Sequence, residues 1–134
     1  MQFTYRVKKS PEFVFNCLTD VGLFVKYHPV ISAMHFQSGN AYIVHEMLKL
    51  GLVPISFKYL ATIESVPEKN LIRMQAKVAK FTHIEMVFEL YPDDDGTRIT
   101  ETVSVRTPLP IVGSLHRIFK KQHTKLFENM ERSR

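Results

Sequence analysis

The sequence predicts an α+β fold in which a curved antiparallel sheet of about seven strands wraps around a long C-terminal helix. Two changes of period support this prediction. Apolar residues recur at every second position for about seventy residues after Pro29, and then at helical spacing after Pro110. One strand and two short helices come before the long run of strands. We expect residues 1–134 to form a single domain, because the length lies within the usual range for one domain.

The first strand is predicted from Phe3, Tyr5 and Val7, which alternate with polar residues. A helix should begin after Ser10, because a serine can cap the free backbone N–H groups and Pro11 is tolerated in the first helical turn. The apolar residues that follow have helical spacing, and they are Phe13, Val14, Cys17 and Leu18.

A second short helix is expected over 24–27, after Asp20 and Gly22 interrupt the first one. It should end at His28, because the residue before a proline disfavours the helical conformation.

Six further strands are expected to form an antiparallel meander, because short turns join them. The turn signals lie at 38–40, 51–54, 67–70, 80–82 and 93–96. The strands between them are predicted at 31–36, 41–50, 55–66, 71–78, 83–91 and 97–107.

The C-terminal segment predicts one amphipathic helix of about twenty residues. Its apolar face carries Val112, Leu115, Phe119, Leu126 and Met130. This helix is the main element left to cover the apolar face of the sheet. Because a helix is only about 10 Å wide, we expect a cavity to remain beside it.

Three segments and the closing helix resemble the START-like or SRPBCC superfamily, the helix-grip fold of the birch pollen allergen, polyketide cyclases and coenzyme Q-binding proteins. The segments are SPEFVFNCLTD, LFVKYHPVI and GTRITETVSV. The resemblance covers nearly the whole chain, and it implies a hydrophobic tunnel between the sheet and the C-terminal helix. None of the segments is a catalytic signature, and this superfamily includes carriers, receptors and enzymes.

The function we expect is binding or transport of a small hydrophobic ligand, such as a lipid, an isoprenoid or a polyketide. Ten phenylalanines, five tyrosines and six methionines provide an aromatic and adaptable lining, although they could equally fill a core. The alternative is an enzyme of the polyketide cyclase or dehydratase type that uses a buried Glu or Tyr as acid or base. A weaker alternative is a protein-interaction module that uses the basic C-terminal helix.

Two carboxylates fall on apolar strand faces and are the first candidates for the polar contacts of a ligand, or for acid–base catalysis. Glu46 shares a face with Val44 and Leu48, and Glu101 shares one with Ile99 and Val103. Burial would raise the pKa of either carboxyl group. A shift of one residue in register would instead place His45 inside and Glu46 in water.

Four more residues complete the predicted site. Tyr59 lies on an apolar strand face, where a phenol needs a hydrogen-bond partner, and it is a third catalytic candidate. Phe119 lies at the apolar centre of the last helix, with Gln122 and His123 on its two flanks, so all three are candidate ligand contacts. His28 is expected to be a loop residue and not a catalytic base.

No metal site or cofactor is expected. The six histidines have no chelating spacing, and Asp93 to Gly96 is better interpreted as a hairpin turn than as a calcium loop. Glycine patterns for nucleotides and the GxSxG nucleophile motif are absent from the sequence. Cys17 lies on an apolar helical face, where a cysteine behaves as a small hydrophobe.

We expect no nucleic-acid partner, although the formal net charge is +5, because the positive residues are scattered. The densest group is Arg117, Lys120, Lys121 and Lys125, which we interpret as a solvated helix face. No segment approaches the roughly 18 apolar residues of a membrane span, and the N-terminus has no signal-peptide pattern. A single cysteine fits a reducing compartment, so we expect a cytoplasmic protein of unassigned oligomeric state.

Overall fold

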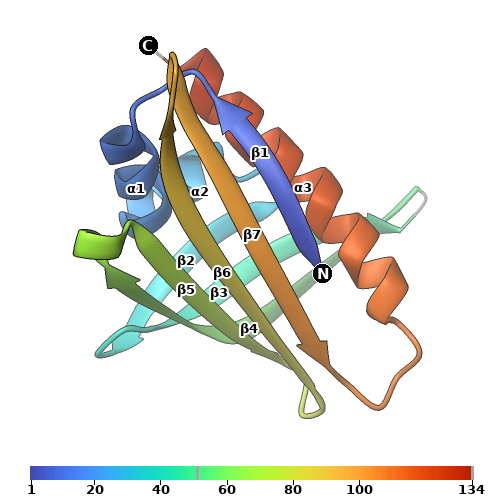
Figure 1. Ribbon diagram of the computed structural model, residues 1–134. Coiled ribbons are helices and arrows are strands. Elements are labelled where there is room, and N and C mark those ends of the chain that lie inside the picture. The colour runs from blue at the N-terminus through green and yellow to red at the C-terminus, as the bar shows by residue number, and fades with distance from the viewer. Residues whose placement is uncertain (51, 134) are drawn as a thin grey trace.

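The structure is a computed structural model that describes residues 1–50 and 52–133. Seven strands form one antiparallel sheet, which confirms the predicted fold. They are β1 (Gln2–Val7), β2 (Ile31–Ser38), β3 (Ala41–Leu50), β4 (Val53–Val66), β5 (Leu71–Val78), β6 (Thr82–Asp93) and β7 (Gly96–Arg106). Figure 1 shows the sheet curving around the C-terminal helix.

The strand order is β1-β7-β6-β5-β4-β3-β2. Each strand from β2 to β7 therefore pairs with its neighbour in sequence, as expected for a meander, and β1 joins the far side beside β7. This arrangement leaves β1 and β2 as the two edges of the sheet. The C-terminal helix, α3 (Val112–Arg132), crosses the concave side next to β1 (Figure 1).

Two helices follow β1, as predicted, and close one end of the sheet: α1 (Pro11–Thr19) and α2 (Val21–Tyr27). The Ser10 hydroxyl accepts a hydrogen bond from the Phe13 amide at 3.1 Å, which caps α1. Asp20 then caps α2 by accepting from the Leu23 amide at 3.0 Å. For this reason α2 begins at Val21, and the prediction that it starts at Phe24 was wrong. Asp20 ends one helix and also initiates the next.

The observed strand ends differ slightly from the predicted ones. β2 continues to Ser38, β4 begins at Val53, and β6 extends to Asp93. The turn predicted at 51–54 falls partly on Gly51, which lies outside the described residues, and Val53 already pairs with Leu50 in the β3–β4 ladder. The turn predicted at 67–70 contains a short 3₁₀ helix, η1 (Pro67–Lys69), followed by Asn70 in the left-handed conformation.

The core lies between the concave face of the sheet, α1 and the C-terminal half of α3. Its fully buried members include Val14, Cys17 and Leu18 from α1, Phe88, Ile99 and Val103 from the sheet, and Leu126 and Met130 from α3. Burial is the main cause that raises the pKa of Cys17 to about 11, which suits a packing role. Val112 was predicted on the apolar face of the last helix, but it is 36% exposed. It is the first residue of α3 and follows the loop that connects this helix to β7.

Candidate functional site

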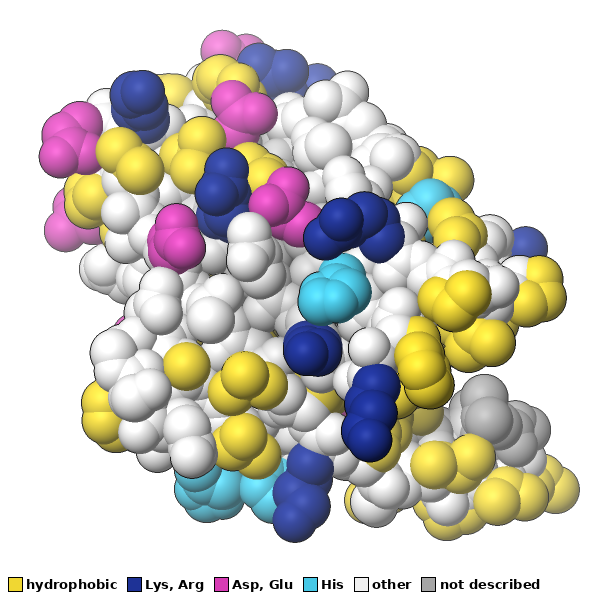
Figure 2. Space-filling model, turned by 90° about the horizontal axis from the view of Figure 1, so that it is seen from below, with side chains coloured by type: hydrophobic (Ala, Val, Ile, Leu, Met, Phe, Trp, Pro, Cys, Tyr) yellow, Lys and Arg dark blue, Asp and Glu magenta, His cyan; other side chains and the backbone are white. Residues whose placement is uncertain are grey.

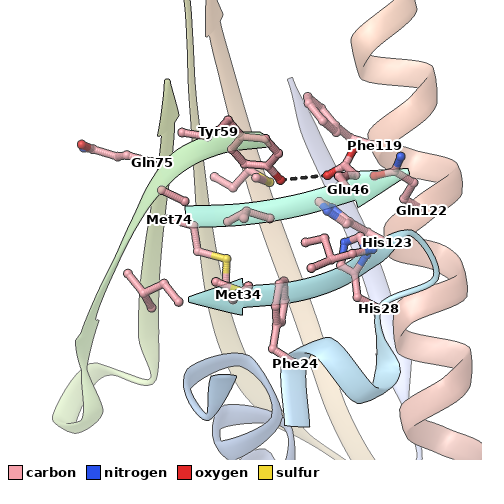
Figure 3. Close-up of a pocket in the computed structure, with 16 residues that line it drawn as sticks. Phe24, His28, Met34, Glu46, Tyr59, Met74, Gln75, Phe119, Gln122 and His123 are labelled. Atoms are coloured by element: carbon pink, nitrogen blue, oxygen red, sulfur yellow. Dashed lines mark hydrogen bonds between the residues drawn. The ribbon is translucent and has the colours of Figure 1, made fainter. Parts of the chain in front are cut away.

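A small cavity lies between α3 and strands β2 to β6. It offers about 50 Å³ to water-sized molecules. Met34, Val44, Ala61, Met74, Met86 and Phe119 are among its apolar lining residues. The polar residues at its wall are His28, Glu46, Tyr59, Gln75, Gln122 and His123. Figure 3 shows that the Gln75 side chain points away from the cavity. The cavity expected beside the helix is thus present, and its lining is mostly apolar.

Glu46 and Tyr59 form a hydrogen-bonded pair at the cavity wall. The Tyr59 hydroxyl donates to Oε1 of Glu46 at 2.8 Å (Figure 3). Burial raises the pKa of Glu46, while the Tyr59 hydrogen bond and His123 act against that rise. Burial, and next the Glu46 carboxylate, raise the pKa of Tyr59 well above its ordinary value. Strands β3 and β4 therefore place one carboxyl group at the cavity wall, that of Glu46, and burial disfavours its ionisation.

The register of β3 decides between the two alternatives left open at this strand. Glu46 lines the cavity together with Val44, so this face of β3 is the inner one. His45 lies on the other face, where its ring meets that of His35 with centroids 4.9 Å apart. The alternation of the strand thus places the carboxyl group inside and the imidazole outside.

Glu101 and His123 form a second pair, deeper in the protein. Nδ1 of His123 lies 2.8 Å from Oε1 and 2.7 Å from Oε2 of Glu101. The Glu101 side chain is fully buried, and that of His123 is 4% exposed. The hydrogen bond to the Glu101 carboxyl group uses Nδ1 of His123 and orients the ring, so Nε2 is the ring nitrogen left for other contacts.

The cavity and Glu101 are separated by this histidine. His123 lines the cavity, whereas Glu101 is absent from its wall. Glu101 also neighbours Tyr5: burial, and next this carboxylate, raise the pKa of the Tyr5 hydroxyl well above its ordinary value. The structure therefore places Glu101 behind His123, out of reach of a molecule in the cavity.

Gln122 and Phe119 lie one helical turn apart on α3 and both face the cavity (Figure 3). Nε2 of Gln122 is buried and has no hydrogen-bond partner in the described structure. Phe119 stacks on the ring of His123, with an interplanar angle of 12°. Gln122 and His123, expected on the flanks of the helix, are both buried. The helix therefore holds one buried hydrogen-bond donor without a partner at the cavity wall.

His28 is a cavity residue that the sequence prediction placed in a loop. It caps the C-terminal end of α2 and is buried. Its Nδ1 accepts hydrogen bonds from the amides of Val30 at 3.3 Å and Ile31 at 3.2 Å. Burial first, and then the neighbouring His123, lower the pKa of His28 to about 3. In the sequence, the His28-Pro29 pair indicates only the end of a helix. It does not indicate that the His28 side chain is buried.

A larger groove lies outside this cavity, between α3 and the strands β2 and β3. It offers about 730 Å³ to water-sized molecules. Ile31 and Gln122 line both the groove and the cavity, so the two adjoin at these residues. Met47, Leu48 and Ile118 are apolar members of the groove, and Lys49, Lys121, Lys125 and Glu128 are its charged members.

Two features are absent from the part of the chain that the structure describes. Among those residues, no three or more His, Cys, Asp or Glu side chains are grouped so that they could hold a metal ion. None of the helices in residues 1–50 and 52–133 is long and apolar enough to cross a membrane.

We expect Glu46→Gln to increase the free energy of unfolding at mildly alkaline pH. The pKa of Glu46 is raised above 4.5 in the folded state, so stability decreases as the pH rises from 4.5 through the folded pKa. Glutamine cannot ionise but keeps a carbonyl acceptor for Tyr59. Urea unfolding at mildly acidic and mildly alkaline pH measures the difference between variant and wild type.

The matched control is Glu89→Gln, because Glu89 also accepts from a tyrosine, Tyr91, but at the exposed surface. We expect the stability of this control to follow the wild type at both pH values. The same pH dependence in wild type and Glu46→Gln would contradict the assigned effect of burial.

The sequence of residues 1–133 matches the family model described as polyketide cyclase / dehydrase and lipid transport. Among curated protein sequences, none matches the chain significantly. Solved structures match it over nearly its full length at low sequence identity, which shows a shared fold.

Three of these structures illustrate the likeness. Ara h 8.0201 is 17% identical, with a TM-score of 0.78, and the match covers 98% of this chain and 93% of that one. The protein TTHA0849 from Thermus thermophilus is 17% identical, with a TM-score of 0.73 and the same coverage. The di-domain ARO/CYC protein StfQ, from the steffimycin biosynthetic pathway, is 11% identical with a TM-score of 0.75, over 98% of this chain and 48% of that one. With the whole-chain match and the seven-stranded helix-grip fold, the chain belongs to the polyketide cyclase/dehydrase and lipid transport family of the START-like superfamily.

Proposed function

We propose that the protein binds a small, largely apolar molecule that carries one polar group. The observation that supports this most directly is Nε2 of Gln122, which is buried at an otherwise mostly apolar wall without a partner in the described structure. A buried donor without a partner costs about 1–3 kcal/mol. A ligand acceptor at this position would recover that cost.

The volumes indicate how such a molecule would lie. Pockets for ligands of ordinary size have volumes of about 300–1,000 Å³. The inner cavity, at about 50 Å³, holds only a few waters, whereas the groove has about 730 Å³. We therefore place the apolar body of the ligand in the groove, against Met47, Leu48 and Ile118, and its polar end at Gln122. The description of the family, which includes lipid transport, agrees with an apolar ligand.

Displacement of Nile red by a long-chain alcohol and by the alkane of the same length tests the proposal. We expect the wild type to prefer the alcohol, and Gln122→Leu to reduce this preference by about tenfold, because one hydrogen bond contributes about 1 kcal/mol or more. Gln75→Leu is the matched control, since Gln75 borders the cavity but its side chain binds Glu85 outside. Failure of the wild type to bind Nile red or either compound would contradict the proposal, as would equal loss of preference in both variants.

A second candidate function is catalysis of the polyketide cyclase or dehydratase type, and the Glu101–His123 pair favours it. The carboxylate orients the ring, and His123 reaches the cavity wall, so its Nε2 could accept a proton from a carbon between two carbonyls. Glu101 would then be a positioning residue and not the acid or base proposed from the sequence. The Tyr59–Glu46 pair would supply the second acid or base.

Incubation with a poly-β-ketone thioester, followed by mass spectrometry, tests this second candidate. Cyclisation with loss of water lowers the mass of the product. We expect His123→Gln and Glu46→Gln to slow product formation, and Glu89→Gln to leave it unchanged. Equal rates in all four proteins would exclude these residues from catalysis.

A further inference from the structure

The end of the β3–β4 hairpin carries apolar side chains that the described part of the protein leaves uncovered. Leu52 is 98% exposed, Val53 is 61% exposed, and Met47 and Ile55 are 47% and 40% exposed. Ile55 pairs with Leu48, which lines the groove, so the apolar inner face of the sheet continues beyond the core toward this end. In Figure 2, apolar side chains gather at the lower right of the molecule. Exposed apolar groups at a projecting end mark an interaction surface.

Three cations stand beside this apolar end. Lys49 pairs with Pro54 in the β3–β4 ladder, next to the tip. Lys121 and Lys125 lie one turn apart on α3 and line the groove across from Lys49. Glu128 is the acidic residue of the same groove, so the surface has an excess of positive charge. We call Met47, Lys49, Leu52, Val53, Ile55, Lys121 and Lys125 together the hairpin face. It includes both sides of the projecting hairpin, because Met47 and Lys49 alternate with Leu48, the partner of Ile55.

We propose that the hairpin face docks on the surface of an anionic lipid bilayer. Apolar side chains at the tip can enter the boundary between headgroups and acyl chains, while lysines beside them pair with anionic headgroups. An anionic bilayer fits this surface better than a second copy of the chain does. Two copies that met through the hairpin face would bring the three lysines of each copy together, and like charges repel. Long lysine side chains can also extend their charge toward the headgroups while their methylene groups pack on apolar surface.

This docking would direct the groove toward the bilayer. Met47 and Lys49 belong both to the groove and to the hairpin face, so a molecule could pass between the acyl region and the groove without crossing bulk water. The proposal concerns the bilayer itself, and vesicle binding is measured without any ligand in the groove. If the protein does not bind vesicles, the docking proposal fails. The proposed binding of an apolar ligand is then not contradicted, because Nile red displacement tests it separately.

A single tryptophan can report on the contact, because the chain contains none. We expect Leu52→Trp to show a blue shift of its emission with phosphatidylcholine vesicles that contain phosphatidylglycerol. Phe81→Trp, at the 60% exposed apolar residue of another turn, should show no shift. Equal shifts in both variants, or no shift in either, would overturn the proposal. A shift of Leu52→Trp that depends on protein concentration without vesicles would identify self-association instead, and would also overturn it.

Charge reversal provides the second arm of the experiment. We expect the triple variant Lys49→Glu, Lys121→Glu, Lys125→Glu to lose at least about tenfold in vesicle affinity, since lysines near an anionic surface are attracted to it and glutamates are repelled. The control triple variant Lys69→Glu, Lys77→Glu, Lys80→Glu has the same net charge but changes exposed residues away from the groove.

Salt should weaken the binding of the wild type, as expected for an electrostatic contact. The proposal would be overturned if the two triple variants bound equally, or if wild-type binding were the same on vesicles with and without phosphatidylglycerol. Circular dichroism of each variant shows that it is folded before it is compared.

Discussion

Glu101→Leu and His123→Leu should each lower the free energy of unfolding by about 3–5 kcal/mol, the largest effect expected for any exchange in this site. In the wild type, Nδ1 of His123 lies 2.7–2.8 Å from the carboxyl oxygens of Glu101, and both side chains are buried. Either substitution leaves the remaining side chain without its partner. The double variant replaces both polar groups by apolar ones, so it should be much less destabilised than the sum of the single variants. Urea unfolding of the four proteins measures this coupling.

An exposed pair provides the matched comparison. Arg73 and Glu85 lie 3.6 Å apart with both side chains accessible to solvent. Surface ion pairs contribute only about 0–1 kcal/mol, so Glu85→Leu should have a small effect, and its double variant with Arg73→Leu should show little coupling. Additive losses in the Glu101 and His123 variants would show that the two side chains do not act as a pair.

Acid should destabilise the protein through His28, and this is the second largest effect that we expect. The folded-state pKa of His28 is lowered to about 3 from 6.5, so between these values the unfolded chain binds a proton that the folded chain does not. The stability present above pH 6.5 is therefore lost as the pH falls toward 3. At about pH 4 the loss from this residue alone is about 3 kcal/mol.

His28→Asn isolates that contribution. Asparagine does not titrate, and its side-chain oxygen can replace Nδ1 as the acceptor for the Val30 and Ile31 amides. The variant loses some packing at every pH, so the quantity to compare is the change in unfolding free energy between neutral and acidic pH. We expect a smaller change in His28→Asn than in the wild type, and an unaltered change in His35→Asn, which alters an exposed histidine. Equal changes in wild type and His28→Asn would contradict the effect assigned to burial.

The fold was predictable because its signals are local. Ser10 and Pro11 mark the start of α1, alternation marks the strands, and the change of period after Pro110 marks α3. The prediction was wrong where one residue serves two elements. Asp20 was interpreted as a break, but its side chain also caps α2, which moves the start of that helix to Val21.

The candidate site was predictable in part. Alternation singled out Glu46, Tyr59 and Glu101, and helical spacing singled out Gln122 and His123. Which of them share one cavity depends on pairing across the sheet and on how α3 crosses it. The structure therefore separates Glu101 from the cavity by one side chain, His123, although both carboxylates have the same pattern in the sequence.

For the lysines of α3 too, the sequence predicts the exposure of the side chains but not their neighbours in space. Lys121 and Lys125 were interpreted as part of a solvated helix face, and they are exposed. They line the same groove as Lys49, which depends on where α3 lies relative to β3, about seventy positions away in the chain. No pattern within the helix indicates which strand it faces.

The sequence by itself determined the order of the elements, the alternation that selects strand faces, and the family, because these depend on neighbouring residues and on the whole-chain match. Only the tertiary structure decided that Glu46 faces the cavity while His45 packs on His35, that Glu101 pairs with His123, and that His28 is buried. The physical reason is that register and helix crossing set the solvent exposure of each polar group. Solvent exposure in turn sets its hydrogen-bond partner and its pKa.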